Sequence, residues 1–168
     1  MYEIKKNFLK QRDLAEKCLI NGEYQKTEKI LKKIIPLDLF NPELYYFLGE
    51  ALCKQYRFKE ALVLLTKADQ LLPNHPRIYH LLGWVQFMNG DADLGRMTLK
   101  KALEKLPDDV SILCDLAVLE NQVQNGQEAI EYATQAIKVD PGNELAQETF
   151  QAMTYFQKLR LNLVRRDN

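Results

Sequence analysis

The side chains best suited to chemistry in this chain of 168 residues are two histidines and three cysteines. His75 and His80 have no serine or cysteine beside them in a recognisable nucleophile motif. Cys18, Cys53 and Cys114 lack the CxxC pairing of zinc and redox sites, which favours three reduced thiols packed among apolar side chains. Glycine-rich phosphate loops and calcium-binding loops are also missing from the sequence. We therefore predict a protein that is not an enzyme and that holds no cofactor and no metal.

Charge is balanced overall but unevenly distributed. The chain has 23 Lys and Arg against 23 Asp and Glu. Residues 1–41 hold nine basic and six acidic side chains, whereas residues 110–157 hold seven acidic side chains and one lysine. The basic segment has two interpretations. It is either a binding patch, for nucleic acid or for an acidic partner protein, or a helix face exposed to solvent. The solvated face is favoured, because no aromatic residues alternate with these lysines to stack on bases, and no nucleic-acid partner is expected.

A period of 34 residues organises most of the chain. Three segments, 42–75, 76–109 and 110–143, follow one another without insertion or deletion. Small residues return at matching places in all three: Gly49, Gly83 and Ala117; Ala61, Gly95 and Ala129; Ala68, Ala102 and Ala136. Such a period indicates one structural unit that is stacked several times.

The small residues predict pairs of crossing helices. Two helices that cross closely need small side chains where their backbones meet and bulky apolar side chains around that contact. In residues 42–75 the first helix would carry Leu48, Gly49 and Leu52 on one stripe, and the second would carry Ala61 and Leu65. The expected fold class is all-α.

A helix-turn-helix unit of 34 residues resembles the tetratricopeptide repeat, whose units stack into a right-handed superhelix. The resemblance implies a single domain over residues 1–168, with about four helix-turn-helix units and a C-terminal capping helix. The expected segments are a degenerate repeat at 8–41, regular repeats at 42–75, 76–109 and 110–143, and a capping helix at 144–163. The stretch before Phe8 and the tail from Arg165 to Asn168 are expected to be frayed.

The resemblance also implies a concave groove, lined by the first helix of each unit at fixed places in the repeat. Those places give the predicted partner-binding residues: Tyr46, Glu50, Lys54, Arg77, His80, Trp84, Phe87, Met88, Cys114 and Val118. His80 and Cys114 share one place in successive units, so their side chains could approach each other. Groove lining is the favoured role for this pair, because a metal would need more ligands.

Trp84 is the only tryptophan and lies off the packing stripe of its helix. Together with Tyr46, Phe87 and Met88 it would form an apolar floor that suits a peptide, since aromatic anchors often dominate binding energy and methionine adapts to different side chains. The alternative is self-burial, in which a terminal helix of the same chain or of a dimer partner fills the groove.

Two narrower resemblances concern the partner. The carboxylate clamp that holds the C-terminal EEVD of heat-shock chaperones is not expected, because its first places hold Tyr46, Glu50 and Leu81 instead of Lys and Asn. The stretch from Leu37 to Asn41, followed by the aromatic helix with Leu48-Gly49, resembles the translocator class of type III secretion chaperones.

The predicted function is a non-catalytic scaffold that binds a partner protein or peptide in its groove; the alternative is a type III secretion translocator chaperone that covers an apolar client segment. The apolar runs are too short for membrane insertion and residues 1–6 lack the apolar centre of a signal peptide, so we expect a cytoplasmic protein. A weak homodimer is also predicted from apolar residues at both ends of the groove: Leu9, Leu19, Ile20, Tyr155 and Phe156.

Overall fold

The computed structural model describes the backbone of residues 2–166 and the side chains of residues 6–162. Within that range every regular element is helical, which confirms the expected all-α class. The elements are α1 (Tyr2–Ile20), α2 (Tyr24–Ile34), the short 3-10 helix η1 (Ile35–Leu37), α3 (Pro42–Cys53), α4 (Phe58–Leu71), α5 (Pro76–Met88), α6 (Ala92–Lys105), α7 (Val110–Gln122), α8 (Gly126–Val139) and α9 (Glu144–Arg166).

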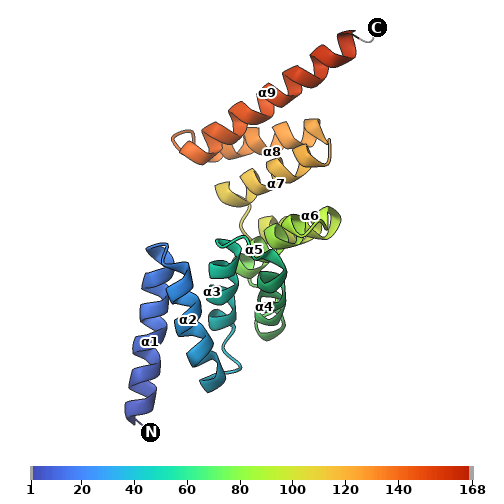
Figure 1. Cartoon of the computed structure of the whole chain (residues 1–168). Coiled ribbons are helices and arrows are strands. Elements are labelled where there is room, and N and C mark those ends of the chain that lie inside the picture. The colour runs from blue at the N-terminus through green and yellow to red at the C-terminus, as the bar shows by residue number, and fades with distance from the viewer. Residues whose placement is uncertain (1, 167–168) are drawn as a thin grey trace.

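The helices pack as consecutive antiparallel pairs in a solenoid. Figure 1 shows the pairs stacked in chain order, with α1 (blue) at one end and α9 (red) at the other. Residues 42–75 contain α3 and α4, residues 76–109 contain α5 and α6, and residues 110–143 contain α7 and α8. The first helices of successive units also touch, from α1 through α3, α5 and α7 to α9. We call the surface formed by these first helices the groove face.

Local sequence signals fix where the helices begin. The Asn41 side chain accepts a hydrogen bond from the backbone N–H of Glu43 at 3.1 Å, and Pro42 occupies the first helical turn of α3. The Asp109 carboxylate caps α7 by accepting from the N–H groups of Ser111 and Ile112. Side-chain oxygens at these places satisfy amides that have no partner within the helix.

Helices α5 and α6 cross closely, at a place where two glycines face each other. A Cβ atom on Gly83 would lie 2.9 Å from both the Cγ and the backbone N of Leu99, and 3.0 Å from the carbonyl oxygen of Gly95. A Cβ atom on Gly95 would lie 2.8 Å from the carbonyl oxygen of Gly83. The small-residue register in the sequence therefore marks the place where two backbones meet.

The two ends of the array depart from the expected boundaries. Helix α1 begins at Tyr2, so residues 2–7 are helical and not frayed; no glycine or proline interrupts residues 2–20. Helix α9 continues to Arg166, beyond the predicted end at residue 163. The remaining tail residues, 167–168, lie outside the described range. Helix α9 packs on α7 and α8 through buried Ala146, Thr149 and Met153, as a capping helix should.

Polar contacts join the first unit to the second and the third to the fourth. Arg57 at the start of α4 contacts Glu28 of α2 at 2.7 Å. Arg96 of α6 binds both carboxylate oxygens of Glu120 on α7, at 2.5 and 3.0 Å, and Glu120 is completely buried. Burial alone would raise the pKa of Glu120, but hydrogen bonds from Arg96 and Asn125 hold it below its ordinary value.

The junction between the second and third units lacks such an ion pair. Gln86 stands at the place in its repeat that Glu120 takes in the next, and it is also buried. Its Oε1 atom has no hydrogen-bond partner among the described residues. In the preceding unit the place that Arg96 takes is filled by Leu62. The three junctions are therefore chemically different although the repeat period in the sequence stays the same.

In the part of the chain that the structure describes, no helix combines the length and the apolar character required to cross a bilayer.

Candidate partner-binding face

An open apolar hollow of about 580 Å³ lies between the ends of α5 and α7. Trp84, Phe87 and Met88 of α5 form one wall, Val118 and Gln122 of α7 form the other, and Val123 follows α7. The turn between α5 and α6 closes one end through Gly90, with Ala92 at the start of α6. We call this hollow the Trp84 groove. No charged side chain lines it, and Met88 and Val118 remain 40% and 37% exposed.

Trp84 has one side against the core and the other toward the groove. Its ring is only half-buried, and it packs against the cluster that contains Leu82 and Val85 of the same helix. The Trp84 and Phe87 rings lie 5.5 Å apart at an angle of 60°. Trp84 is therefore partly a packing residue and partly a wall of the groove.

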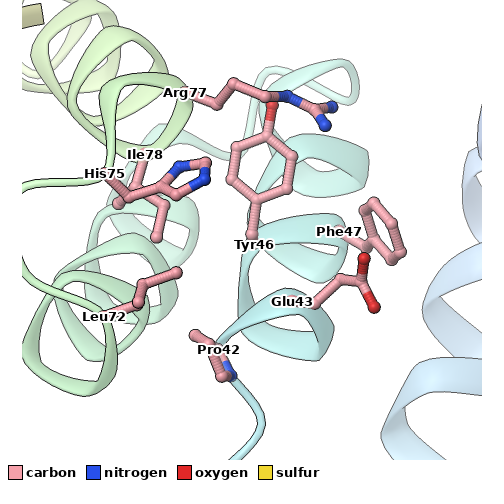
Figure 2. A pocket seen from close by; sticks show the side chains of 8 residues that line it. All are labelled: Pro42, Glu43, Tyr46, Phe47, Leu72, His75, Arg77 and Ile78. Carbon is pink, nitrogen blue, oxygen red and sulfur yellow. The ribbon is translucent and has the colours of Figure 1, made fainter. Parts of the chain in front are cut away.

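A second, smaller hollow lies nearer the start of α3 and α5 (Figure 2). Its volume is about 140 Å³. We call it the Tyr46 pocket, and its lining residues are Pro42, Glu43, Tyr46, Phe47, Leu72, His75, Arg77 and Ile78. Figure 2 shows the His75 ring directed toward the Tyr46 ring, with the Arg77 guanidinium beside the Tyr46 hydroxyl.

The Tyr46 phenol is held in its neutral form. The Arg77 guanidinium carbon lies 5.2 Å from the centre of the Tyr46 ring, within the range of a cation–π contact. Burial, reinforced by the Glu50 carboxylate, raises the pKa of Tyr46 to about 12. The hydroxyl is therefore a hydrogen-bonding group at neutral pH and not a charge.

The polar partner of His80 on α7 is Asp115 and not Cys114. His80 Nε2 lies 2.8 Å from the Oδ2 atom of Asp115, the residue after Cys114. Cys114 is only 2% exposed and packs with Leu113, Ala136 and Ala146, where α9 covers α7. Among the described residues no third His, Cys, Asp or Glu joins the His80–Asp115 pair in a potential metal site. Cys114 thus offers no surface to a ligand, and Asp115 takes its place on the groove face.

The other predicted residues lie on three neighbouring first helices. Tyr46, Glu50 and Lys54 follow one another along α3, with Lys54 exposed directly after the helix end. The predicted residues of α5 and α7 divide between the two hollows, except Cys114, which lines neither, and His80, which bridges from α5 to α7 through Asp115. Asp115 carried a signal that the sequence reasoning missed, namely a carboxylate directly after the repeat counterpart of a histidine.

Tyr56 was also missed by the sequence reasoning. It lies in the turn after α3, is 81% exposed and has a φ of 61°, whereas Gly22 and Gly90 occupy the matching turns of two other units. A hollow of about 400 Å³ lies beside Tyr56 and Phe58 and shares Met88 with the Trp84 groove. An aromatic residue at a place that favours glycine was the available signal.

The family comparison gives a match in the middle of the chain. A profile described as Tetratricopeptide repeat matches residues 52–113. The chain is also 31% identical over 96 residues to the TPR repeat-containing protein PA4667 of Pseudomonas aeruginosa. That alignment covers 56% of this chain and 16% of the relative, so the chain spans a small part of the relative's length.

Solved structures show the same fold at lower identity. The MamA protein superposes with a TM-score of 0.76 and 20% identity, covering 96% of this chain and 88% of MamA. YrrB, described as a TPR protein with an unusual peptide-binding site, gives a TM-score of 0.72 and 22% identity, covering 82% and 71% of the two chains. These matches give no support to the alternative of a type III secretion chaperone. The family profile over residues 52–113, the named relative and the stacked helix pairs together show that this chain is similar to tetratricopeptide-repeat proteins and has their fold.

Proposed function

We propose that this protein is a non-catalytic, cytoplasmic scaffold that binds a peptide segment of a partner protein in the Trp84 groove. The observation that supports the proposal most strongly is the groove itself, an open hollow of about 580 Å³ whose walls carry aromatic and aliphatic side chains and no charge. Soluble proteins seldom leave contiguous apolar surface uncovered unless it binds something. Apolar pockets with few polar groups are the usual form of binding sites.

A peptide ligand fits the groove in both shape and chemistry. The groove lies between two first helices, α5 and α7, and stays open to solvent, so a peptide chain can enter it. Aromatic side chains such as Trp84 and Phe87 supply large contact areas with little loss of side-chain entropy. The likeness to YrrB, which is described as having a peptide-binding site, also supports a peptide as the ligand.

Trp84→Ala is expected to weaken peptide binding by about 2 kcal/mol or more, roughly 30-fold in Kd. Twelve-residue peptides selected from a random display library on the immobilised protein are suitable probes. Their affinity is measured by calorimetry for the parent and the variant. Trp84 is the only tryptophan, so a shift of its emission to shorter wavelength in the parent reports directly that the peptide has displaced water from the groove.

Leu82→Ala is the matched control, because Leu82 lies on the same helix but is buried away from the groove. It should lower the melting temperature more than Trp84→Ala does and leave peptide affinity nearly unchanged. Suppose instead that Trp84→Ala strongly lowers the melting temperature while peptide capture is unaffected. Trp84 would then be a core residue, and the binding site would lie elsewhere.

We further propose a weak homodimer that competes with the partner. Ile20 on α1 and Tyr155 on α9 are 78% and 60% exposed, and Leu9 and Phe156 are also exposed. Leu19 does not belong to this surface, because it is buried. Sedimentation velocity over a range of concentrations should show reversible self-association that decreases when a selected peptide is bound. A strict monomer at high concentration removes the dimer, and a dimer that persists unchanged with peptide removes the competition.

A further inference from the structure

We infer that the turn between α2 and α3 is a docking site for a membrane surface that carries anionic lipids. The contact is peripheral: exposed apolar side chains of the turn enter the lipid interface, and lysines of α1 and α2 face the lipid headgroups. The inference goes beyond peptide binding and does not depend on the Trp84 groove.

Three large apolar side chains are exposed at this turn. Phe40 is 82% exposed, and Leu37 and Leu39 are each more than half exposed. We call these three residues the apolar tip. A single exposed apolar side chain is ordinary, but three of them within four residues form a patch whose burial would be favourable.

The repeat itself shows that the turn does not require this composition. Phe40 stands where the following three units have Asn74, Asp108 and Gly142. Leu39 stands where all three of those units have proline. Asparagine, aspartate, glycine and proline are residues that turns favour, each for a local backbone reason. Leucine and phenylalanine at these two places therefore need another explanation than turn formation.

Hydrogen bonds hold the backbone of the turn in place. The Tyr45 hydroxyl donates to the carbonyl oxygen of Leu39 at 3.1 Å. The backbone N–H of Asp38 donates to the carbonyl oxygen of Ile35 at 3.0 Å, and the Asn41 amide donates to the Asp38 carboxylate at 3.1 Å. The apolar tip is therefore preorganised, and its insertion costs little backbone entropy.

Four exposed lysines lie at the same edge of the molecule. Lys6 and Lys10 are in the first half of α1, and Lys29 and Lys33 are in the last two turns of α2. Figure 1 shows the start of α1 and the end of α2 at the edge where the turn lies. None of the four forms an ion pair with a described residue, whereas Lys32 does. Clusters of about four or more basic side chains beside an apolar element indicate anionic-lipid binding.

The acidic side chains beside the tip do not cancel this charge. Asp38 accepts a hydrogen bond from Asn41, and Glu43 lies 3.8 Å from Arg12. Arg12 also contacts Asp13. Residues 1–41 together hold nine basic side chains against six acidic ones. The four lysines are therefore available to an external anion.

The apolar tip distinguishes a membrane from other anionic partners. Nucleic acid offers phosphates to the lysines, but only Phe40 could stack on a base, and Leu37 and Leu39 would stay in water. An acidic protein segment would pair with the lysines and leave the whole tip exposed. A bilayer supplies anionic headgroups and an apolar layer directly beneath them, so it matches both halves of the surface.

Flotation of the full chain with lipid vesicles tests the proposal. The protein should bind vesicles made of equal parts phosphatidylcholine and phosphatidylglycerol. It should bind pure phosphatidylcholine vesicles about a hundredfold more weakly, because each lysine near an anionic surface contributes roughly fivefold. Added salt should weaken binding to the mixed vesicles. Equal binding to both kinds of vesicle, or binding to neither, would overturn the proposal.

The role of the tip has a matched pair of variants. Phe40→Asn installs the residue type that the next unit has at this place, so the turn should keep its fold and the melting temperature should hardly change. Binding to the mixed vesicles should weaken about tenfold. Val63→Asn is the control, because Val63 is also exposed but lies on α4, outside the tip. Equal effects of the two substitutions would show that the tip makes no special contact.

The lysines have a matched pair as well. Lys33→Gln should weaken binding to the mixed vesicles about fivefold. Lys101→Gln makes the same charge change at the same repeat place on α6 and should have almost no effect. Equal losses would mean that only the net charge matters and would overturn the site. If a polyglutamate peptide binds through Lys33 while no vesicle does, the edge recognises acidic protein and the membrane proposal is wrong.

Insertion of the tip has a direct optical readout. Phe40→Trp in a Trp84→Phe background places the only tryptophan of the chain at the tip. Its emission should shift to shorter wavelength with the mixed vesicles, and lipids with brominated acyl chains should quench it. An emission spectrum that stays unchanged while the protein floats with the vesicles would show a purely electrostatic contact and overturn the insertion of the tip.

Discussion

Gly83→Leu is expected to lower the free energy of unfolding by about 3 kcal/mol or more, the upper end of the usual cost of overpacking. Two of the three atoms that a Cβ atom at this position would meet at 2.9–3.0 Å belong to the backbone of α6. Backbone atoms cannot rotate away as a side chain can, so the two helices must move apart. Chemical denaturation followed by circular dichroism measures the loss.

Alanine at two equivalent glycines is the control for this explanation. A Cβ atom on Gly49 would meet the Leu65 side chain at 2.8 and 2.9 Å, while the nearest backbone oxygen is 3.6 Å away. Gly49→Ala should therefore cost less than Gly83→Ala, because the Leu65 side chain can shift. A Gly83→Leu protein as stable as its parent, or a circular dichroism spectrum with substantial strand content, would contradict the described crossing.

Arg96→Met is expected to destabilise the protein by about 3 to 5 kcal/mol at pH 7, because it leaves the fully buried Glu120 carboxylate without its bidentate partner. In the parent the folded-state pKa of Glu120 lies below its unfolded value, so its contribution to stability is present above that value and lost as pH falls through the folded pKa. In Arg96→Met the order of the two pKa values should reverse, because burial is the largest influence on the Glu120 pKa and the hydrogen bond from Asn125 then opposes it without Arg96. The stability difference between parent and variant should therefore increase from about pH 4 to pH 7.

Arg57→Met is the matched control at a more exposed junction. Its partner Glu28 keeps a contact with Lys32 at 2.7 Å and is not fully buried, so no carboxylate becomes isolated. We expect a much smaller loss and little change of that loss with pH. A loss in Arg96→Met that is the same at pH 4 and pH 7 would show that the stability comes from packing of the Arg96 side chain and not from its charge.

The sequence predicted the helix pairs well because each helix crossing requires small residues at fixed places in the repeat. A place such as Gly83 tolerates only a very small side chain, and this requirement returns with every unit. The ends of the array carry no such requirement. Helix α1 has a neighbour on one side only, so the start at Tyr2 depends on the absence of a helix-breaking residue and not on the repeat.

The groove face was predicted less well, because side-chain partners across units depend on small rotations of the helices. The shared repeat place of His80 and Cys114 suggested that they would meet, but α7 turns Cys114 toward α9 and presents Asp115 instead. The Tyr46 pocket is formed partly by Leu72 and His75, in and after the end of the second helix of its unit. A rule based only on first-helix places cannot find residues of that kind.

The pairing of Arg96 with Glu120 makes the order of the units part of the protein's chemistry. An in-frame deletion of residues 76–109 would preserve the helix phase and remove one whole unit, as repeat arrays often tolerate. It would also bring Glu120 opposite Leu62, the counterpart of Arg96 in the preceding unit, and bury a carboxylate against an aliphatic side chain. Units of equal length are thus not interchangeable here. When repeats are deleted, duplicated or reordered, the residues that face each other across a junction, such as Arg96 and Glu120, must stay together.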